Sequence, residues 1–288
     1  LSAASLYFML NVFYRMGAKQ MQLSTSCNLE TLKKLQGIID TYDIGIEIGD
    51  FSSPKVLNDE SAYAEHLQKY KQYFNGTDIK RTMHGPFFDL SIHAHDDDFA
   101  FLSRQKILKA IESCRELQCS KITFHSGYLP ILRSKSYRDD VIQKQISVWH
   151  EICDANNDIL ICLENMFEKD AAFLHEIIAK TNLDNLCFCF DVAHSAVFSN
   201  ETPKKWIKRM SEYLRHVHLS GCDGAFDEHR ELNFGKINLV KVINTIENLG
   251  ENISYVLEVS GNKNRVEKSI TYLEKNGLIE KKQAIIRG

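Results

Sequence analysis

The stretch NLCFCFDVAH, residues 185–194, is an apolar run that ends on an aspartate and a histidine. A short apolar run of this composition predicts a buried β-strand. Asp191 and His194 are then expected where the strand ends. Burying charged groups without partners is costly, so two metal-capable side chains at this place indicate a functional site.

Seven other runs of this kind recur along the chain at fairly regular intervals. Together the eight runs cover residues 21–27, 44–49, 79–85, 121–127, 158–165, 185–194, 214–221 and 254–261. Between them, apolar residues recur at helical spacing, as in 101–118, 141–156, 203–214 and 238–250.

Residues typical of helix ends lie at the borders of these helical segments. Helix starts are expected at Asn28, at the Thr202-Pro203 pair and at Asn238, and helix ends at Gly250 and Gly277.

Strand followed by helix, eight times, predicts an α/β protein with a closed (β/α)8 TIM barrel. Such a barrel takes about 250 residues, and the chain has 288. An open doubly wound sheet is the alternative, but no GxGxxG or other phosphate loop follows the first strand. We therefore assign residues 20–288 to a single barrel domain.

Residues 1–19 begin with Leu and contain a short apolar run interrupted by Asn11 and Arg15. The run is shorter than the roughly 20 apolar residues of a membrane span. We expect this segment to be an N-terminal extension, native or added, and no membrane association.

Composition and charge narrow the class of protein further. The formal net charge is −3, the pI is about 6.4, and no dense Lys/Arg block is present. This argues against a nucleic-acid partner, since basic patches dominate nonspecific binding. The eight cysteines contain no CxxC pair and mostly lie in apolar runs, which predicts reduced core thiols in a cytoplasmic protein.

Carboxylates and imidazoles end most of the predicted strands. In a TIM barrel the carboxyl ends of the strands meet at one mouth, and adjacent buried carboxylates would be costly there without cations. Such oxygen and nitrogen ligands bind divalent metals. The residues predicted to converge are His84, His125, Glu164, Asp191, His194, His218 and Glu258, with Asp227 and His229 from the loop after the seventh strand.

Other polar residues are weaker candidates. Glu47, in the second strand, is equally consistent with an ion-pair partner. His93 and His95 precede an Asp run that fits a solvated loop and the start of a helix. Trp149 and Trp206 lie in helical segments and are expected to pack in the outer layer.

The segments MHGPFFDLS, TFHSGY, CLENMF, FDVAH, HVHLSG, FDEHRELNFG and LEVSG each lie at an expected strand end. On these segments the chain resembles the xylose isomerase-like TIM-barrel superfamily, from about residue 22 to residue 273. That superfamily includes sugar and sugar-phosphate isomerases and epimerases, and the endonuclease IV class of abasic-site nucleases.

The epimerase-like branch implies one divalent metal bound by positions matching Glu164, Asp191, His218 and Glu258. Glu164 and Glu258 would also act as acid and base through a metal-stabilised enediolate. His84, His125 and His194 would bind substrate oxygens. Arg230 is a candidate for a phosphate or hydroxyl contact and is equally consistent with a solvated loop residue. Oxygen and nitrogen ligands accept several divalent ions. We expect zinc or manganese, with magnesium or cobalt as alternatives.

The endonuclease IV branch implies three zinc ions, bound by all nine carboxylates and imidazoles of the predicted mouth, for phosphodiester cleavage at abasic DNA. The sequence departs from that branch: GPFFDLS follows His84 without its Tyr and Asn, and the loop after the seventh strand lacks its Asn and Lys. The DNA-inserting basic and aromatic insertions are also absent from the loops after the first strands.

We therefore expect a metal-dependent isomerase or epimerase acting on a small sugar, polyol or sugar phosphate. A zinc-dependent phosphodiesterase of the endonuclease IV type is the alternative, and a noncatalytic ligand-binding barrel is the third reading. Barrels of this class often pair, so a homodimer is an expectation that no sequence feature specifies.

Overall fold

The computed structural model of the chain describes residues 21–250, 252–259 and 262–282. The N-terminal extension expected over residues 1–19 lies outside this part. No described helix is long and apolar enough to cross a membrane.

Eight parallel strands close into one barrel, so the predicted fold class is confirmed. Each strand pairs with the next along the chain, and β1 pairs with β8 to close the ring. The strands are β1 (Gln22–Cys27), β2 (Gly45–Ile48), β3 (Arg81–His84), β4 (Lys121–His125), β5 (Leu160–Glu164), β6 (Leu186–Asp191), β7 (Leu214–Leu219) and β8 (Ser254–Leu257).

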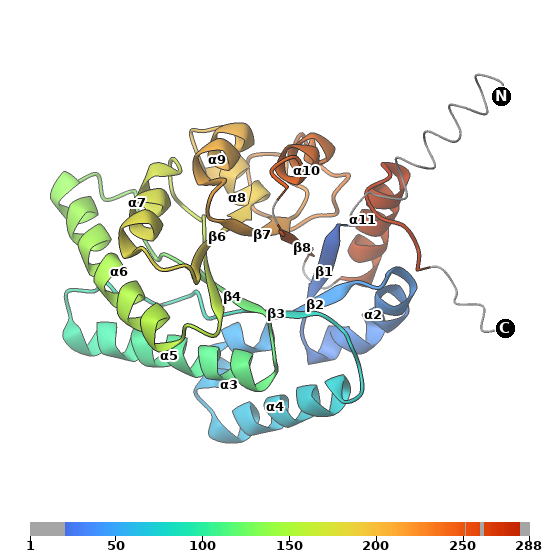
Figure 1. Cartoon of the computed structure of the whole chain (residues 1–288), viewed down its shortest axis with the longest axis horizontal. Helices are drawn as coiled ribbons and strands as arrows, with labels where there is room; N and C mark the ends of the chain where they lie inside the picture. Colours follow the sequence, from blue (N-terminus) through green and yellow to red (C-terminus); the bar gives the residue numbers. More distant parts are fainter. Residues whose placement is uncertain (1–20, 251, 260–261, 283–288) are drawn as a thin grey trace.

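Helices surround the strands, as Figure 1 shows. They are α2 (Leu29–Tyr42), α3 (Pro54–Leu57), α4 (Glu60–Phe74), α5 (Asp97–Glu116), α6 (Lys135–Ala155), α7 (Ala172–Thr181), α8 (Val192–Phe198), α9 (Pro203–Met210), α10 (Leu239–Glu247) and α11 (Lys263–Lys275), with a short 3₁₀ turn, η1 (Asp50–Ser52), after β2.

The predicted helix starts are confirmed. The Asn28 side chain accepts a hydrogen bond from the backbone N–H of Thr31 in a capping box, which satisfies free donors of the first turn of α2. Asn238 likewise caps α10 through its side chain, and Pro203 follows Thr202 as the first residue of α9.

The apolar run over residues 185–194 divides differently from the prediction. Strand β6 ends at Asp191, and α8 begins at the next residue. Asp191 is the N-cap of α8, and its carboxylate accepts a hydrogen bond from the backbone N–H of His194 at 2.6 Å. The three-residue spacing of this pair is thus the spacing of a helix cap and its first turn.

The core between barrel and helices is closely packed. Trp149 and Trp206 are fully buried there, as predicted for the outer layer, and the ring of Trp206 stacks on Phe188 with centroids 5.9 Å apart. All eight cysteines are free and buried, as expected of reduced core thiols.

A candidate metal centre at the carboxyl end of the barrel

The strand register brings the predicted site residues to one end of the barrel. His84, His125, Glu164 and Asp191 are the last residues of β3, β4, β5 and β6. His125 lies opposite Glu164, and Asp191 lies opposite His218 of β7. Glu258 follows the last residue of β8 directly. The sequence order of strands thus becomes a ring of ligands at the mouth.

Glu164 lies at the middle of this ring. Its Oε2 atom is 3.2 Å from Nε2 of His125 and 3.2 Å from Nδ1 of His218. His84 approaches the same oxygen at 3.5 Å, while Nδ1 of His194 lies 3.1 Å from Oε1. One buried carboxylate therefore meets four imidazoles from four different elements.

Glu258 is the second carboxylate that approaches Nδ1 of His218. Its Oε2 atom lies 3.2 Å from Nδ1 of His218. Nδ1 of His218 is therefore the same distance from a Glu164 oxygen and a Glu258 oxygen. We call Glu164, Asp191, His218 and Glu258 the four-residue centre.

A second group lies beside this centre, on the loop after β7 and the start of α8. Asp227 Oδ2 lies 3.2 Å from Nε2 of His194 and 3.3 Å from Nε2 of His229. His229 has a left-handed backbone, with φ of 45°, which is uncommon for a residue other than glycine. The Glu258 carbonyl lies 3.0 Å from Nδ1 of His229 and helps to hold the ring. We call His194, Asp227 and His229 the outer group.

The residues of the four-residue centre fit a cation because each has a buried polar atom without a hydrogen-bond partner. These atoms are both carboxylate oxygens of Glu164, Oδ2 of Asp191, Nδ1 of His218 and Oε2 of Glu258. Leaving a single buried acceptor unsatisfied costs about 1–3 kcal/mol. Several at one point, all of them types that ligate divalent metals, are what a metal site requires.

Several combinations at the mouth bring three ligand atoms within reach of one ion. They include His84 with His125 and Glu164, His84 with His218 and Glu258, Glu164 with Cys189 and His218, and the outer group of His194, Asp227 and His229. Nε2 of His125 and Oδ1 of Asp227 are also buried without a hydrogen-bond partner. The mouth therefore has ligands for more than one cation.

The charge states of the carboxylates and imidazoles at the mouth depend on their burial and on these close ion pairs. Burial opposes ionisation of Glu164, but the imidazoles of His218 and His125 outweigh it and hold its pKa well below the usual range. Burial raises the pKa of Asp191 to about 7, against the effect of His194. Burial opposes protonation of His194, but Asp191 and other carboxylates raise its pKa well above its usual value. Protons on imidazoles thus balance the carboxylates, and a metal that binds here must displace them.

A hydrogen-bonded network, which the sequence did not reveal, lies below the mouth, toward the amino ends of the strands. Glu47 is fully buried and its Oε2 lies 2.9 Å from Nε2 of His216, while its Oε1 lies 3.2 Å from Nε2 of His218. Thr82 donates to Glu47 at 3.1 Å. Nδ1 of His216 lies 2.7 Å from Oγ of Ser254, which accepts a hydrogen bond from Lys121 at 2.9 Å. We call Thr82, Glu47, His216, Ser254 and Lys121 the buried network.

His216 could have been found from its spacing. Residues two apart on a strand point to the same face, so His216 must point into the barrel if His218 does. Of the two readings of Glu47, the structure supports the ion-pair partner: its partners are imidazoles of β7.

Arg230, also a predicted site residue, contacts other residues of its own loop. Its Nε atom lies 3.4 Å from Glu231, and its guanidinium lies 4.2 Å from the ring centre of Phe234. These partners belong to the loop after β7. A contact of Arg230 with substrate stays a prediction.

His93 and His95 lie apart from the cluster, as expected for structural residues. His93 is buried with Nδ1 3.4 Å from the Gln145 amide, and burial lowers its pKa to about 4. His95 is exposed, 3.7 Å from Asp140.

Aromatic side chains, which the sequence did not single out, line the rim of the mouth. The ring of Phe87 lies 5.3 Å from those of His84 and His125, and the ring of Phe198 lies 6.2 Å from that of His194. Next to Phe198 is a cleft of about 330 Å³ with mixed apolar and basic walls, lined by Leu129, Pro130, Ile131, Arg133, Phe167, Lys169 and Phe198. The rim thus offers apolar faces beside a polar centre, an arrangement typical of small-molecule sites.

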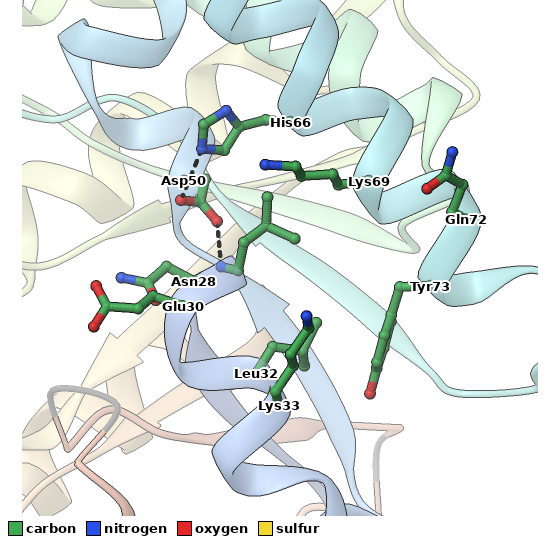
Figure 2. Close-up of a pocket in the computed structure, with 10 residues that line it drawn as sticks. Asn28, Glu30, Leu32, Lys33, Asp50, His66, Lys69, Gln72 and Tyr73 are labelled. Carbon is green, nitrogen blue, oxygen red and sulfur yellow. Dashed lines mark hydrogen bonds and ion pairs between the residues drawn. The ribbon is translucent and has the colours of Figure 1, made fainter.

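A larger cleft, of about 820 Å³, lies between α2 and α4 and is lined by none of the clustered residues. Figure 2 shows Asp50 in this cleft, between His66 and the start of α2. The Asp50 carboxylate accepts hydrogen bonds from the backbone N–H of Leu29 at 2.9 Å and from the Tyr70 hydroxyl at 2.5 Å. Asp50 therefore ties α2 to α4, and the cleft has no comparable set of unpartnered ligand atoms among the residues described.

Comparisons with known proteins agree with this architecture. The model of the family described as xylose isomerase-like TIM barrel matches residues 44–276. An uncharacterized protein of Methanocaldococcus jannaschii is 26% identical over 222 residues, covering 73% of this chain and 71% of its own length.

Two solved structures share the fold at low identity. One, described as a D-tagatose 3-epimerase-like protein, has a TM-score of 0.74 and 22% identity, covering 89% of this chain and 97% of that one. The other is the TTHB071 protein of Thermus thermophilus soaked with zinc chloride, with a TM-score of 0.67 and 21% identity, covering 89% of this chain and 98% of that one.

Proposed function

This chain belongs to the xylose isomerase-like TIM barrel family, and from that premise we propose that it is a metal-dependent isomerase or epimerase of a small sugar, polyol or sugar phosphate. The observation that carries the proposal is the pair of carboxylates, Glu164 and Glu258, that converge on Nδ1 of His218 at 3.2 Å each. Both have buried oxygens without hydrogen-bond partners.

Glu164, Asp191, His218 and Glu258 would bind the cation, with zinc or manganese as the first candidates. A divalent ion bound there would supply positive charge that stabilises negative charge developing on substrate oxygens. The donor set of three carboxylates and one imidazole suits several divalent ions. The zinc-soaked structure with the same fold is consistent with zinc.

The chain's own groups would then move the proton. One of Glu164 and Glu258 takes the proton from the carbon next to the substrate carbonyl, and the other returns a proton to the opposite face or to the adjacent carbon. The pKa of Glu258 is lowered because His218 outweighs the effect of burial, so its carboxylate is ionised at neutral pH and can accept a proton.

The imidazoles around the pair would orient the substrate. His84, His125 and His194 surround Glu164 at 3.1–3.5 Å, so their rings are near any substrate that reaches this carboxylate. Phe87 and Phe198 would pack on the apolar face of a sugar at the rim, which excludes water from the proton transfer. A small carbohydrate is thus the proposed partner. The free, buried cysteines support a reducing compartment such as the cytoplasm.

The reaction is tested by incubating metal-loaded protein with ketohexoses, including D-tagatose, in deuterated water. Proton transfer by the two glutamates predicts that deuterium enters the product at the carbon that reacts. Epimerised product without deuterium would instead indicate a hydride shift, and the roles of Glu164 and Glu258 as base and acid would be wrong.

One observation favours a second candidate, a zinc-dependent phosphodiesterase of the endonuclease IV type. The outer group, together with His84 and His125, offers ligands for additional ions. A multinuclear site can generate hydroxide and stabilise both the attacking and the leaving oxygens of a phosphodiester.

Metal stoichiometry separates the two candidates. Elemental analysis of protein that was dialysed against zinc or manganese is expected to give about one ion per chain for the isomerase or epimerase. About three zinc ions per chain, with cleavage of a duplex that contains an abasic site, would support the phosphodiesterase in place of the isomerase or epimerase.

A further inference from the structure

We propose that Glu47 and His216 are positioning residues that hold His218 in the one orientation and tautomer in which Nδ1, rather than Nε2, is the metal-binding atom. The inference rests on the metal site of the proposed function and does not depend on the reaction catalysed there.

The first argument is that Nε2 of His218 already has a partner. It lies 3.2 Å from Oε1 and 3.4 Å from Oε2 of Glu47. Both residues are fully buried, so water does not compete for this contact. A buried carboxylate that accepts the N–H of an imidazole fixes the position of the ring and leaves the other nitrogen free to bind a cation.

The second argument is that Glu47 is itself held by the buried network. His216 Nε2 lies 2.9 Å from Oε2 of Glu47, and the Thr82 hydroxyl donates to the same oxygen at 3.1 Å. Three donors thus converge on one carboxylate, which keeps it ionised and aligned with His218.

The third argument is the direction of the hydrogen bonds beyond His216. The ammonium group of Lys121 has only donors, and it donates to Oγ of Ser254 at 2.9 Å. Ser254 can then donate its own hydrogen to Nδ1 of His216, 2.7 Å away. His216 in this tautomer carries its hydrogen on Nε2, the atom that faces Glu47. Every member of the chain from Lys121 to Glu47 therefore has a role that agrees with its neighbours.

The consequence lies on the opposite edge of the His218 ring. Nδ1 points to the space between Glu164 and Glu258, 3.2 Å from an oxygen of each, and has no hydrogen-bond partner. The atom that remains free is the one that faces the other ligands. Without Glu47 the ring could turn and present either nitrogen.

A competing reading treats Glu47, His216 and His218 as a metal site of their own, since their ligand atoms lie close together. His216 uses both ring nitrogens in hydrogen bonds, to Ser254 and Glu47. A cation there would have to break the network, whereas a cation at the four-residue centre would satisfy atoms that lack hydrogen-bond partners.

The test measures zinc binding by titration calorimetry on full-length protein that was stripped with a chelator. Replacement of Glu47 by leucine (Glu47→Leu) is expected to weaken zinc binding by about 10- to 100-fold, the usual effect of losing a group that orients a ligand. Glu47→Gln keeps an oxygen that accepts from Nε2, and its affinity is expected to lie between those of Glu47→Leu and the unmodified protein.

Matched histidine variants control for general damage to the fold. His216→Phe removes a partner of Glu47 and is expected to weaken zinc binding, while His93→Phe removes a buried histidine outside the network and is expected to leave it unchanged. Circular dichroism and thermal denaturation establish that each variant is folded. Equal zinc affinity in folded Glu47→Leu and unmodified protein would overturn the inference.

A crystal structure of the unmodified protein with zinc tests the same point without any variant. Zinc within bonding distance of Nδ1 of His218, about 2.0–2.1 Å, is the expected result. Zinc on Nε2, or zinc bound between Glu47 and His216, would contradict the inference but leave the proposed reaction standing. Failure of the unmodified protein to bind any divalent ion would instead remove the metal site and the proposed function with it.

Discussion

The four-residue centre and the buried network use similar residues in the same barrel, yet they differ in how well their polar atoms are paired. In the network, the donors of Thr82, His216 and Lys121 each meet an acceptor. At the mouth, Glu164, Asp191, His218 and Glu258 all keep buried atoms without a hydrogen-bond partner. In the network, the one buried oxygen without a hydrogen-bond partner is Oε1 of Glu47, which lies 3.2 Å from Nε2 of His218. The mouth has the greater number of such atoms, and the network beneath it supports the side chain of His218.

Glu258→Gln should give the largest effect and separates the two regions most sharply. Turnover at saturating metal is expected to fall by roughly 10²- to 10⁴-fold, because a general acid–base group is lost, while the fold is retained. Turnover is measured on the ketose panel and folding by circular dichroism.

The control is Glu228→Gln, on the loop after β7, whose side chain is exposed. It should behave like the unmodified protein. If Glu258→Gln kept most of the activity, the assignment of Glu258 as acid or base would have to be abandoned.

Metal removal tests the claim that the mouth is incomplete without a cation. Zinc at 100 times its dissociation constant should stabilise the fold by about 2.7 kcal/mol, which corresponds to a rise in Tm of roughly 5–10 °C. Scanning calorimetry of chelator-treated protein with and without zinc measures the shift. An unchanged Tm would show that the unpartnered atoms are not a metal site.

Lys121→Met tests whether the end of the network farthest from the mouth also contributes to stability. Ser254 Oγ and the Arg215 carbonyl each lose a donor that lies 2.9 Å away. The free energy of unfolding should fall by about 1–3 kcal/mol, measured by urea denaturation of metal-free protein. Zinc affinity should change much less than in Glu47→Leu. A large loss of zinc affinity with unchanged stability would instead show that Lys121 acts mainly through the hydrogen-bond chain that orients His218.

The pH dependence of metal-free protein tests the pairing of imidazoles with carboxylates at the mouth. Burial opposes protonation of His229, but Asp227 and Glu258 raise its pKa from 6.5 to about 9. A raised folded-state pKa contributes stability that is fully present below pH 6.5 and is lost as the pH rises through about 9. The Tm of metal-free protein should therefore fall between about pH 7 and about pH 9.5.

Asp227→Asn removes the carboxylate nearest to His229 and should flatten this slope. Zinc-loaded protein should also show a weaker slope, because the ion takes the place of the protons. A Tm that rises over this range would mean that the imidazoles are not paired with the carboxylates as the structure has them.

The sequence was sufficient to predict the fold. Each of the eight apolar runs contains a strand, because short buried strands and amphipathic helices have distinct periods. It was less exact on where strands end. The Asp191–His194 pair looked like one strand end, but the backbone changes to helix between the two residues, and an N-cap aspartate fits either description.

The candidate site was visible in the sequence only where one residue could be judged alone. His218 follows an apolar strand and could be singled out, but its dependence on Glu47 and His216 could not. Those contacts join β2 to β7, across a separation in sequence that no local pattern covers. The sequence therefore left Glu47 open as a weak site candidate or an ion-pair partner. Arg230, whose contacts are with Glu231 and Phe234, was likewise left open as a substrate contact or a solvated loop residue.

The placement of His216 directly beneath His218 on one strand matters for anyone who wishes to transplant this centre. Copying Glu164, Asp191, His218 and Glu258 onto another eight-stranded scaffold would reproduce the four ligands. The imidazole ring of the histidine would, however, be free to rotate. A working graft would need at least Glu47 and His216 as well. The smallest unit that could be transferred therefore includes two successive layers of side chains inside the barrel.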